Sequence, residues 1–381
     1  MKKFLSMLLV LMLALSLVAC GGGQTEGEGE TEGNTEAEAL SVCFITQQLG
    51  DNSFADAADR SMKSYADTYG VDYHCTQLGG TGDAITASRE AGQAGYDIVA
   101  VQYDAEVAAM LDAEAGDYPD TIFYMFSAPN TYTPSAANVV SGYFRSCESS
   151  YMGGIVAGHV STTGVCAYIG GMESTGLYDW MFGYVQGVKL AGSMSVYSWI
   201  SGDNPWSDPA KAKELSMALY NNYDADTFWG CAGQSGDGVF EAVRELRDTT
   251  GSDAFWALGV DADQHAIFAA NGKDDIADLI LTSCMKNPVG PVETFIQTLQ
   301  AGGTVEGGML TVGAAQNACI IAENDFYLAN APQAAQEAVA AAKADLVAGT
   351  SSVVTAYGMT NEEINAFLQE HTLNYVASTL A

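Results

Sequence analysis

The sequence predicts an α/β protein built on two parallel, doubly wound sheets. From residue 40 onward, short runs rich in β-branched and aromatic residues alternate with longer alanine-rich segments of helical pattern. Apolar residues make up 48% of the chain and charged residues 16%, which allows a substantial core in each of two lobes. Because the series of strands is long for one compact sheet, we expect two sheets.

The first half of the series opens with a strand at 41–46 (SVCFIT) and a helix from Ser53 to Tyr69, which Gly70 ends. Further strands are expected at 71–78, 96–102, 121–127 and 138–144, with helices over 83–94 and around 148–160. A second series then follows, with strands at 164–170, 194–200, 226–233, 255–261 and 279–285. A helical segment between successive strands is typical of parallel pairing.

The amino terminus is predicted to be a targeting segment that is not part of the fold. Lys2 and Lys3 precede an apolar run of the length typical of a signal peptide. The run ends in LVACG (17–21), which resembles a bacterial lipoprotein lipobox, so we expect 1–20 to be a signal peptide and Cys20 to be lipidated. The alternative is a simple signal peptide with an incidental cysteine.

Residues 21–39 predict a flexible tether. The stretch is rich in Gly and Glu and holds no aromatic residue, so it cannot bury enough apolar area to offset its ordering entropy. Its like charges repel one another and favour an extended chain. The prediction is therefore a folded body anchored by lipid to the extracytoplasmic face of the cell membrane.

The charge balance excludes one class of partner. The chain carries 47 acidic and 14 basic residues, for a net charge of −33. A surface this acidic repels phosphate backbones, and no cluster of Lys and Arg overrides it. We expect no binding of nucleic acid.

The common catalytic constellations are missing, so we expect no enzyme, no cofactor and no metal. The four histidines are far apart in the sequence and fit no zinc spacing. The nucleophile-elbow pattern GxSxG and the phosphate-binding pattern GxxxxGK are both absent. Seven of the eight cysteines are scattered beyond Cys20, which favours buried free thiols over a disulfide framework.

Ligands of open α/β sheets bind at the carboxyl ends of the strands. The residues that follow the predicted strands offer aromatic faces, carboxylates, amides and one lysine. This set suits a neutral, flat, polyhydroxylated molecule, since rings stack on aromatics and carboxylates accept from hydroxyl groups. The candidates are Gln47, Asp51, Phe54, Asp104, Trp206, Gly233, Gly236, Asp261 and Lys286.

At these positions the chain resembles the basic membrane protein family of nucleoside-binding lipoproteins. The resemblance covers nearly all of residues 40–320 and rests on seven motifs in the family's order. They are Asp51-x-Ser53-Phe54, Phe144-Arg145 with Glu148, Gly170-Gly171-Met172, Asp208-Pro209-Ala210-Lys211, Gly236-x-Gly238-Val239-Phe240, Gly259-Val260-Asp261-x-Asp263-Gln264 and Thr282-Ser283-x-x-Lys286.

The resemblance implies the type I periplasmic-binding fold, with two Rossmann-like lobes joined by a hinge of crossing strands. It implies capture of a nucleoside, with a purine base, between the lobes, without a chemical step on the ligand. The resemblance also implies that the nucleoside is delivered to an ABC permease and its ATPase. The implied first lobe covers 40–147 and 285–320, and the second covers 148–284 and 321–381.

The resemblance also implies roles for the candidate residues. Phe54 would cover one face of the base and Trp206, at a position where the family usually has phenylalanine, would cover the other. Asp261 and Lys286 would hold the ribose hydroxyls, and Asp104 would accept from the base edge. Gln47 stands where the family has aspartate, which changes the hydrogen bonds offered to the base.

Two other functions fit the same residues. Aromatic stacking with carboxylates also suits pyranoses, so a sugar or signal-molecule receptor that feeds a sensor is one alternative. A tethered surface nucleoside hydrolase is the other.

Overall fold

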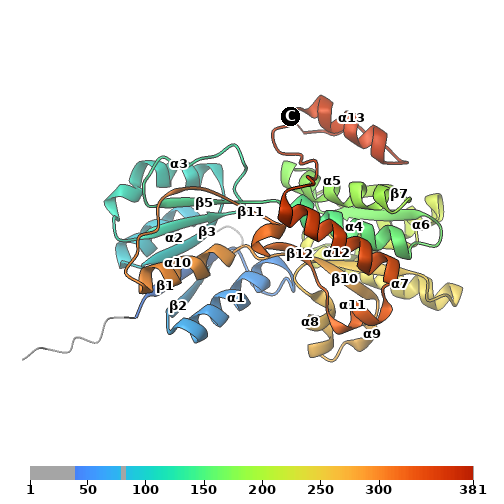
Figure 1. Cartoon of the computed structure of the whole chain (residues 1–381), viewed down its shortest axis with the longest axis horizontal. Helices are drawn as coiled ribbons and strands as arrows, with labels where there is room; N and C mark the ends of the chain where they lie inside the picture. The colour runs from blue at the N-terminus through green and yellow to red at the C-terminus, as the bar shows by residue number, and fades with distance from the viewer. Residues whose placement is uncertain (1–38, 79–82, 381) are drawn as a thin grey trace, which may run out of the picture. The chain divides into compact units, whose positions relative to one another are not determined.

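The computed structural model describes residues 39–78 and 83–380, and the chain from Ala39 onward forms one compact unit. The predicted signal peptide, the lipidation site Cys20 and the linker up to residue 38 lie outside the described residues. Two six-stranded sheets organise the unit (Figure 1).

The first sheet has the strand order β11-β5-β4-β3-β1-β2, and its paired strands run parallel. Its first strand and helix match the predicted boundaries closely, and Gly70 ends the helix in the left-handed conformation. The elements are β1 (Ser41–Thr46), α1 (Phe54–Tyr69), β2 (Asp72–Gln77), α2 (Ala84–Ala94), β3 (Ile98–Gln102), α3 (Ala105–Glu114), β4 (Ile122–Phe126), β5 (Val139–Phe144), α10 (Gly290–Gln300) and β11 (Gly308–Val312).

The second sheet has the order β12-β10-β9-β8-β6-β7 and is parallel except for the antiparallel pair of β10 and β12. Its elements are α4 (Ser146–Val160), β6 (Val165–Gly170), α5 (Thr175–Leu190), β7 (Met194–Trp199), α6 (Pro209–Tyr223), β8 (Thr227–Cys231), α7 (Asp237–Thr250), β9 (Trp256–Asp261), α8 (Gln264–Ala270), α9 (Asp274–Ala277), β10 (Ile280–Lys286), β12 (Cys319–Ile321), α11 (Asp325–Asn330), α12 (Gln333–Ala348) and α13 (Asn361–His371).

The chain crosses between the sheets at three places: after β5, after β10 and between β11 and β12. The crossing segments bond to one another, since Arg145 N donates to Val312 O over 2.9 Å and Asn287 N donates to Ala318 O over 3.0 Å. We call the first sheet with its helices the first lobe and the second sheet with its helices the second lobe. Two doubly wound lobes joined by crossing segments confirm the predicted fold class.

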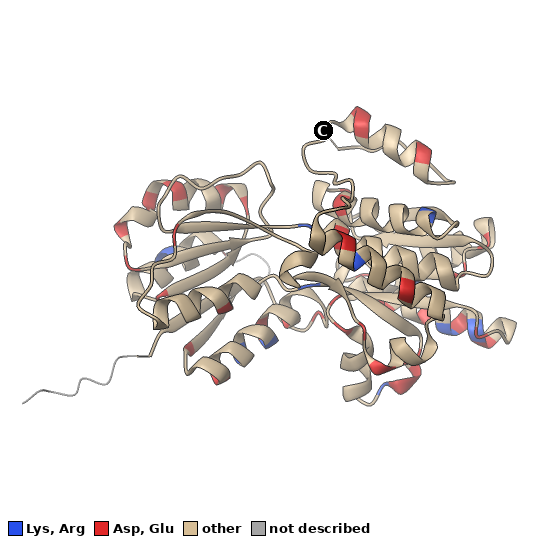
Figure 2. Ribbon diagram, in the orientation of Figure 1, with Lys and Arg blue, Asp and Glu red and all other residues tan. Residues whose placement is uncertain are grey.

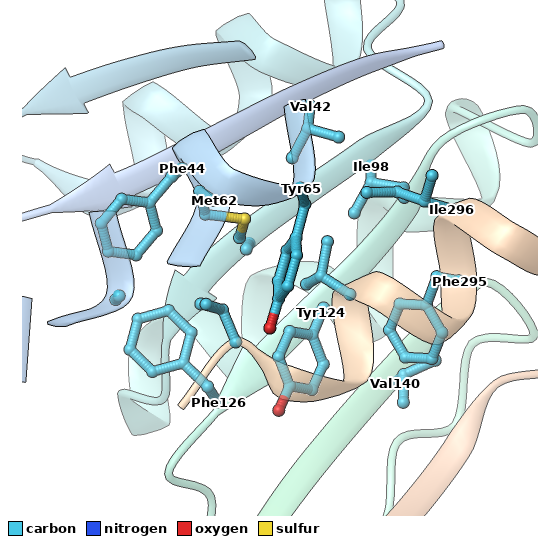
Figure 3. Close-up of a cluster of buried hydrophobic side chains, with 14 of the residues drawn as sticks. Val42, Phe44, Met62, Tyr65, Ile98, Tyr124, Phe126, Val140, Phe295 and Ile296 are labelled. Carbon is cyan, nitrogen blue, oxygen red and sulfur yellow. The ribbon is translucent and has the colours of Figure 1, made fainter. Parts of the chain in front are cut away.

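Each face of the first sheet is covered by a different pair of helices. Helices α1 and α10 pack on one face, while α2 and α3 pack on the other. On the first of these faces Tyr124 of β4 meets Phe295 of α10 edge to face, with ring centroids 5.5 Å apart (Figure 3). The burial of these apolar faces, rather than helix propensity, is what fixes the helices on the sheet.

In the second lobe, α4 and α5 pack so closely that only glycine fits between them. A side chain at Gly187 would overlap the carbonyl oxygen of Tyr151, and one at Gly183 would overlap that of Cys147. The close approach of these helices holds α5, and the loop that precedes it, against the carboxyl end of β6.

The carboxyl-terminal segment covers the exposed edge of the second sheet. Leu373 N donates to Ser195 O of edge strand β7 over 2.9 Å, and Phe367 of α13 stacks on Phe182 of α5 at 3.8 Å. Pairing of an otherwise open strand edge protects it from association with other chains.

Asp and Glu are spread over the helices of both lobes, whereas Lys and Arg are few (Figure 2). The seven cysteines within the described residues are all free, and six of them are buried, which confirms the prediction of free thiols. Within residues 39–78 and 83–380, no helix is long and apolar enough to cross a membrane.

Candidate ligand-binding site

The start of helix α1 leaves the hydroxyl of Ser53 available for a contact outside the helix. Ser53 occupies the cap position of this helix, but its hydroxyl makes no capping bond. The carboxylate of Asp51 takes over that role, accepting from the backbone N–H of Ser53 over 2.9 Å and of Ala55 over 3.0 Å. Carboxylates at this position satisfy the unpaired N–H groups of a helix start.

The freed hydroxyl reaches the other lobe. Ser53 Oγ donates to Asp261 Oδ2 over 2.7 Å, and Gln264 Nε2 of α8 donates to the carbonyl of Asn52 over 3.2 Å. Asn52 and Asp261 both adopt positive φ, 50° and 64°, a conformation that is uncommon outside glycine. Unusual backbone on both sides of one contact indicates that the surrounding structure holds this junction in place.

Asp261 and Lys286 lie at the ends of neighbouring strands. Met285 of β10 pairs with Asp261 of β9, so Lys286 follows directly beside the carboxylate. Burial raises the pKa of Asp261 above the usual carboxyl value, while the Lys286 charge and the Ser53 hydrogen bond oppose that rise. The pair offers one carboxylate acceptor and one ammonium donor at the same place, which is the chemistry that binds hydroxyl groups.

The ammonium of Lys286 lies over two aromatic rings. Its Nζ is 4.8 Å from the ring centre of Phe54 and 5.6 Å from that of Trp180. Phe54 in turn packs at 5.8 Å on Phe126, at the end of β4. The structure thus gathers Phe54, Asp261 and Lys286, all predicted from the sequence, at the junction of the lobes.

Trp206 belongs to a second group of predicted residues. Its carbonyl accepts from Ser235 N over 3.1 Å, which ties its loop to the segment Gly233–Gly236. Gly171, at the end of β6, lies under the indole, because a Cβ there would be 2.6 Å from the ring. Trp206 as a whole is 44% exposed, so part of it is accessible for contact.

Gln47 and Asp104 follow the paired strands β1 and β3, so they lie at the carboxyl edge of the first sheet. Both are exposed. Asp104 caps α3 by accepting from Glu106 N over 2.8 Å, which is the structural role that an aspartate before an alanine-rich helix predicts.

A cavity of about 430 Å³ has Asp261 and Lys286 among its lining residues. The other walls come from α1, α8 and the crossing segments, including Arg60, Asn287 and Asn317. In residues 39–78 and 83–380, no cluster of three or more His, Cys, Asp and Glu is arranged to hold a metal ion.

Sequence reasoning missed Ser53, Gln264 and Trp180 as site residues. Ser53 and Gln264 belong to two of the family motifs, but nothing in one sequence shows that their side chains reach the other lobe. Trp180 lies within a helix at apolar spacing, where a core role is the simplest interpretation.

Two doubly wound lobes joined by crossing segments give the chain the fold of the periplasmic solute-binding proteins. A solute-binding protein of an ABC transporter from Aeropyrum pernix K1 superposes with a TM-score of 0.71, over 87% of this chain and 97% of that one, at 19% identity. A second from Conexibacter woesei gives a TM-score of 0.67, over 84% and 100%, at 18% identity. These likenesses establish the fold.

The family follows from the sequence itself. Residues 39–344 match the family described as ABC transporter substrate-binding protein PnrA-like. The chain belongs to this family. It is also 29% identical over 327 residues to the ABC transporter nucleoside-binding protein BmpA of Lactococcus lactis, covering 82% of this chain and 89% of that protein.

Proposed function

We propose that the protein captures a nucleoside with a purine base between its lobes and delivers it to the permease of an ABC importer, whose ATPase drives uptake. The observation that carries the proposal is the contact of Ser53 with Asp261 beside Lys286 and Phe54. It joins a pair suited to ribose hydroxyls with an aromatic face suited to a base. The name of the Lactococcus relative supports the same ligand class.

In the proposed complex Phe54 and Trp206 stack on the base, and Asp261 with Lys286 holds the ribose. Gly233 and Gly236 permit close approach of the backbone, and Gln47 with Asp104 contacts the base edge. Asp51 shapes the loop that carries Phe54 by accepting from the backbone N–H groups of Ser53 and Ala55. The ligand leaves chemically unchanged, and it favours the closed form because it binds both lobes at once.

The proposal includes the anchor. Cys20 carries the lipid, and the Gly/Glu-rich linker lets the binding unit stand off the extracytoplasmic face of the membrane. Mass spectrometry of the protein from native membranes tests this part. An amino-terminal diacylated Cys20 is expected, and a free amino terminus elsewhere would overturn the anchor.

The ligand is tested by denaturing the purified protein, identifying released small molecules by mass spectrometry, and measuring thermal shifts with nucleosides and sugars. We expect a nucleoside, recovered unchanged, and an upward shift that Asp261→Ala and Trp206→Ala abolish. The exposed Asp120→Ala serves as the matched control and should keep the shift. A response to sugars alone would overturn the nucleoside assignment, and recovery of free base with ribose would indicate the hydrolase.

A further inference from the structure

Trp180 is the second aromatic ring on the Lys286 ammonium, and it comes from the opposite lobe to Phe54. The ammonium lies 5.6 Å from the Trp180 ring centre. Among the Lys and Arg residues of the described ranges, most pair with a carboxylate within 4 Å, whereas the Lys286 ammonium lies over these two rings. The two rings, together with the nearby charge of Asp261, therefore determine where this ammonium lies.

The Trp180 ring is held rigidly in place. It is 5% exposed and packs edge to face on Trp229, with ring centroids 5.7 Å apart. Trp229 Nε1 donates to Gly259 O over 3.0 Å, on the same strand that ends in Asp261. A continuous set of contacts thus links the ring under Lys286 with the strand that carries the carboxylate.

We propose that Trp180 is a positioning residue that sets the hydroxyl selectivity of the site. It holds the Lys286 ammonium by a cation–π contact beside Asp261. The ammonium and the carboxylate can then bind the same hydroxyl groups of the ligand. A flexible lysine stem has many rotamers, and a fixed aromatic face removes most of them before the ligand arrives. This inference rests on the proposed function, because it takes the hydroxyls to be those of a ribose.

The test compares two probes, adenosine and 2′,3′-dideoxyadenosine, by calorimetric titration of the purified protein. Wild type should prefer adenosine. In Trp180→Leu the ratio of the two affinities should fall by about threefold or more, since the cation–π contact that holds the ammonium beside the carboxylate is lost. A purely structural role would instead weaken both probes equally and leave the ratio unchanged.

Two further variants complete the test. In Lys286→Met the ratio should fall on its own, and adding Trp180→Leu to it should lower the ratio no further, because the ammonium is already absent. Trp256→Leu removes a tryptophan that contacts Arg247 instead, and it should keep the wild-type ratio.

Each outcome decides one hypothesis. If wild type binds neither probe nor any other nucleoside, the proposed function fails. If wild type prefers adenosine and Trp180→Leu keeps that preference, the role of Trp180 alone is overturned. Should Trp180→Leu not fold, Trp180→Phe decides, because its weaker ring face should give an intermediate ratio and an unchanged ratio contradicts the inference.

Discussion

Ser53 of the first lobe donates its hydroxyl to the carboxylate of Asp261 in the second lobe over 2.7 Å. The donor is available because Asp51, rather than Ser53, satisfies the start of helix α1. A bond between lobes forms only when the lobes are close together. It therefore stabilises the same closed arrangement that the proposed ligand would select by binding Asp261.

Ser53→Ala tests this coupling. Loss of a hydrogen bond to a carboxylate should weaken ligand binding by about tenfold, since such bonds contribute ~1.5–3 kcal/mol and the freed carboxylate regains some solvent. Calorimetric titration measures the affinity. Ser64→Ala removes an exposed hydroxyl from the same helix and should bind as wild type does. Equal affinities for the two variants would show that the contact does not take part in closure.

Gly171→Ala tests whether ligand binding depends on the position of the Trp206 indole, which lies over Gly171. The new methyl group would lie 2.6 Å from the indole, so the ring must move. We expect weaker ligand binding with little loss of folding stability, because Trp206 as a whole is 44% exposed and its ring can swing outward. Gly116→Ala, where a Cβ meets nothing within 4 Å, is the matched control. Titration together with thermal unfolding separates the two effects, and unchanged affinity would argue against Trp206 as a ligand contact.

The regular part of the fold could be predicted because its patterns are local. Buried strands such as 41–46, with the apolar run VCFI at its centre, have a pattern of their own, and Gly70 ends its helix by adopting positive φ. Strands β11 and β12 were not predicted. The first is largely exposed and the second has three residues, so neither has a hydrophobic pattern of its own, and both are defined by their partners in the sheets.

The site could be predicted only in part. Asp261 and Lys286 end strands, and the rule that ligands bind at carboxyl ends selects both as candidates from the sequence. Ser53 and Trp180 contact neighbours that lie far away in the chain, and only the folded structure brings Ser53 to the Asp261 carboxylate and Trp180 to the Lys286 ammonium.

Gly187→Ala should destabilise the second lobe. The added methyl group meets the carbonyl oxygen of Tyr151, and both helices would have to separate to admit it. Overpacking of this kind costs about 1–3 kcal/mol, and we expect the upper end because the obstacle is backbone rather than a side chain. Urea unfolding measures the loss against Gly116→Ala. A loss no greater than that of the control would mean that the helices pack less closely than described.

Asp179 of α5 is fully buried beneath the chain around Thr355. It accepts from the hydroxyl of Thr355 and from the backbone N–H of Cys147 over 3.1 Å. The Thr355 hydroxyl also lies 3.2 Å from that of Tyr143 on β5 of the first lobe. Burial raises the pKa of Asp179 to about 6, and these hydrogen bonds only partly offset the rise.

A raised carboxyl pKa makes the folded protein less stable as pH rises. Unfolded Asp179 loses its proton near its usual pKa of about 4, whereas the folded protein keeps the proton until about pH 6. Between these values the folded state binds more protons than the unfolded state, so the free energy of unfolding falls with rising pH, by ~3 kcal/mol in total for this group. Above about pH 6 the cost stays constant.

Asp179→Asn removes the titration while keeping the shape. The acceptor bonds that Asn cannot make change the free energy of unfolding by an amount that does not depend on pH. The slope of the free energy of unfolding against pH, between pH 4 and pH 6, is therefore the quantity to compare. Urea unfolding across this range should show wild type losing stability relative to Asp179→Asn as pH rises. The exposed Asp120→Asn should keep the wild-type slope. If Asp179→Asn keeps it too, this carboxyl titrates at the same pH in the folded and unfolded chain, and the segment around Thr355 does not bury it as described.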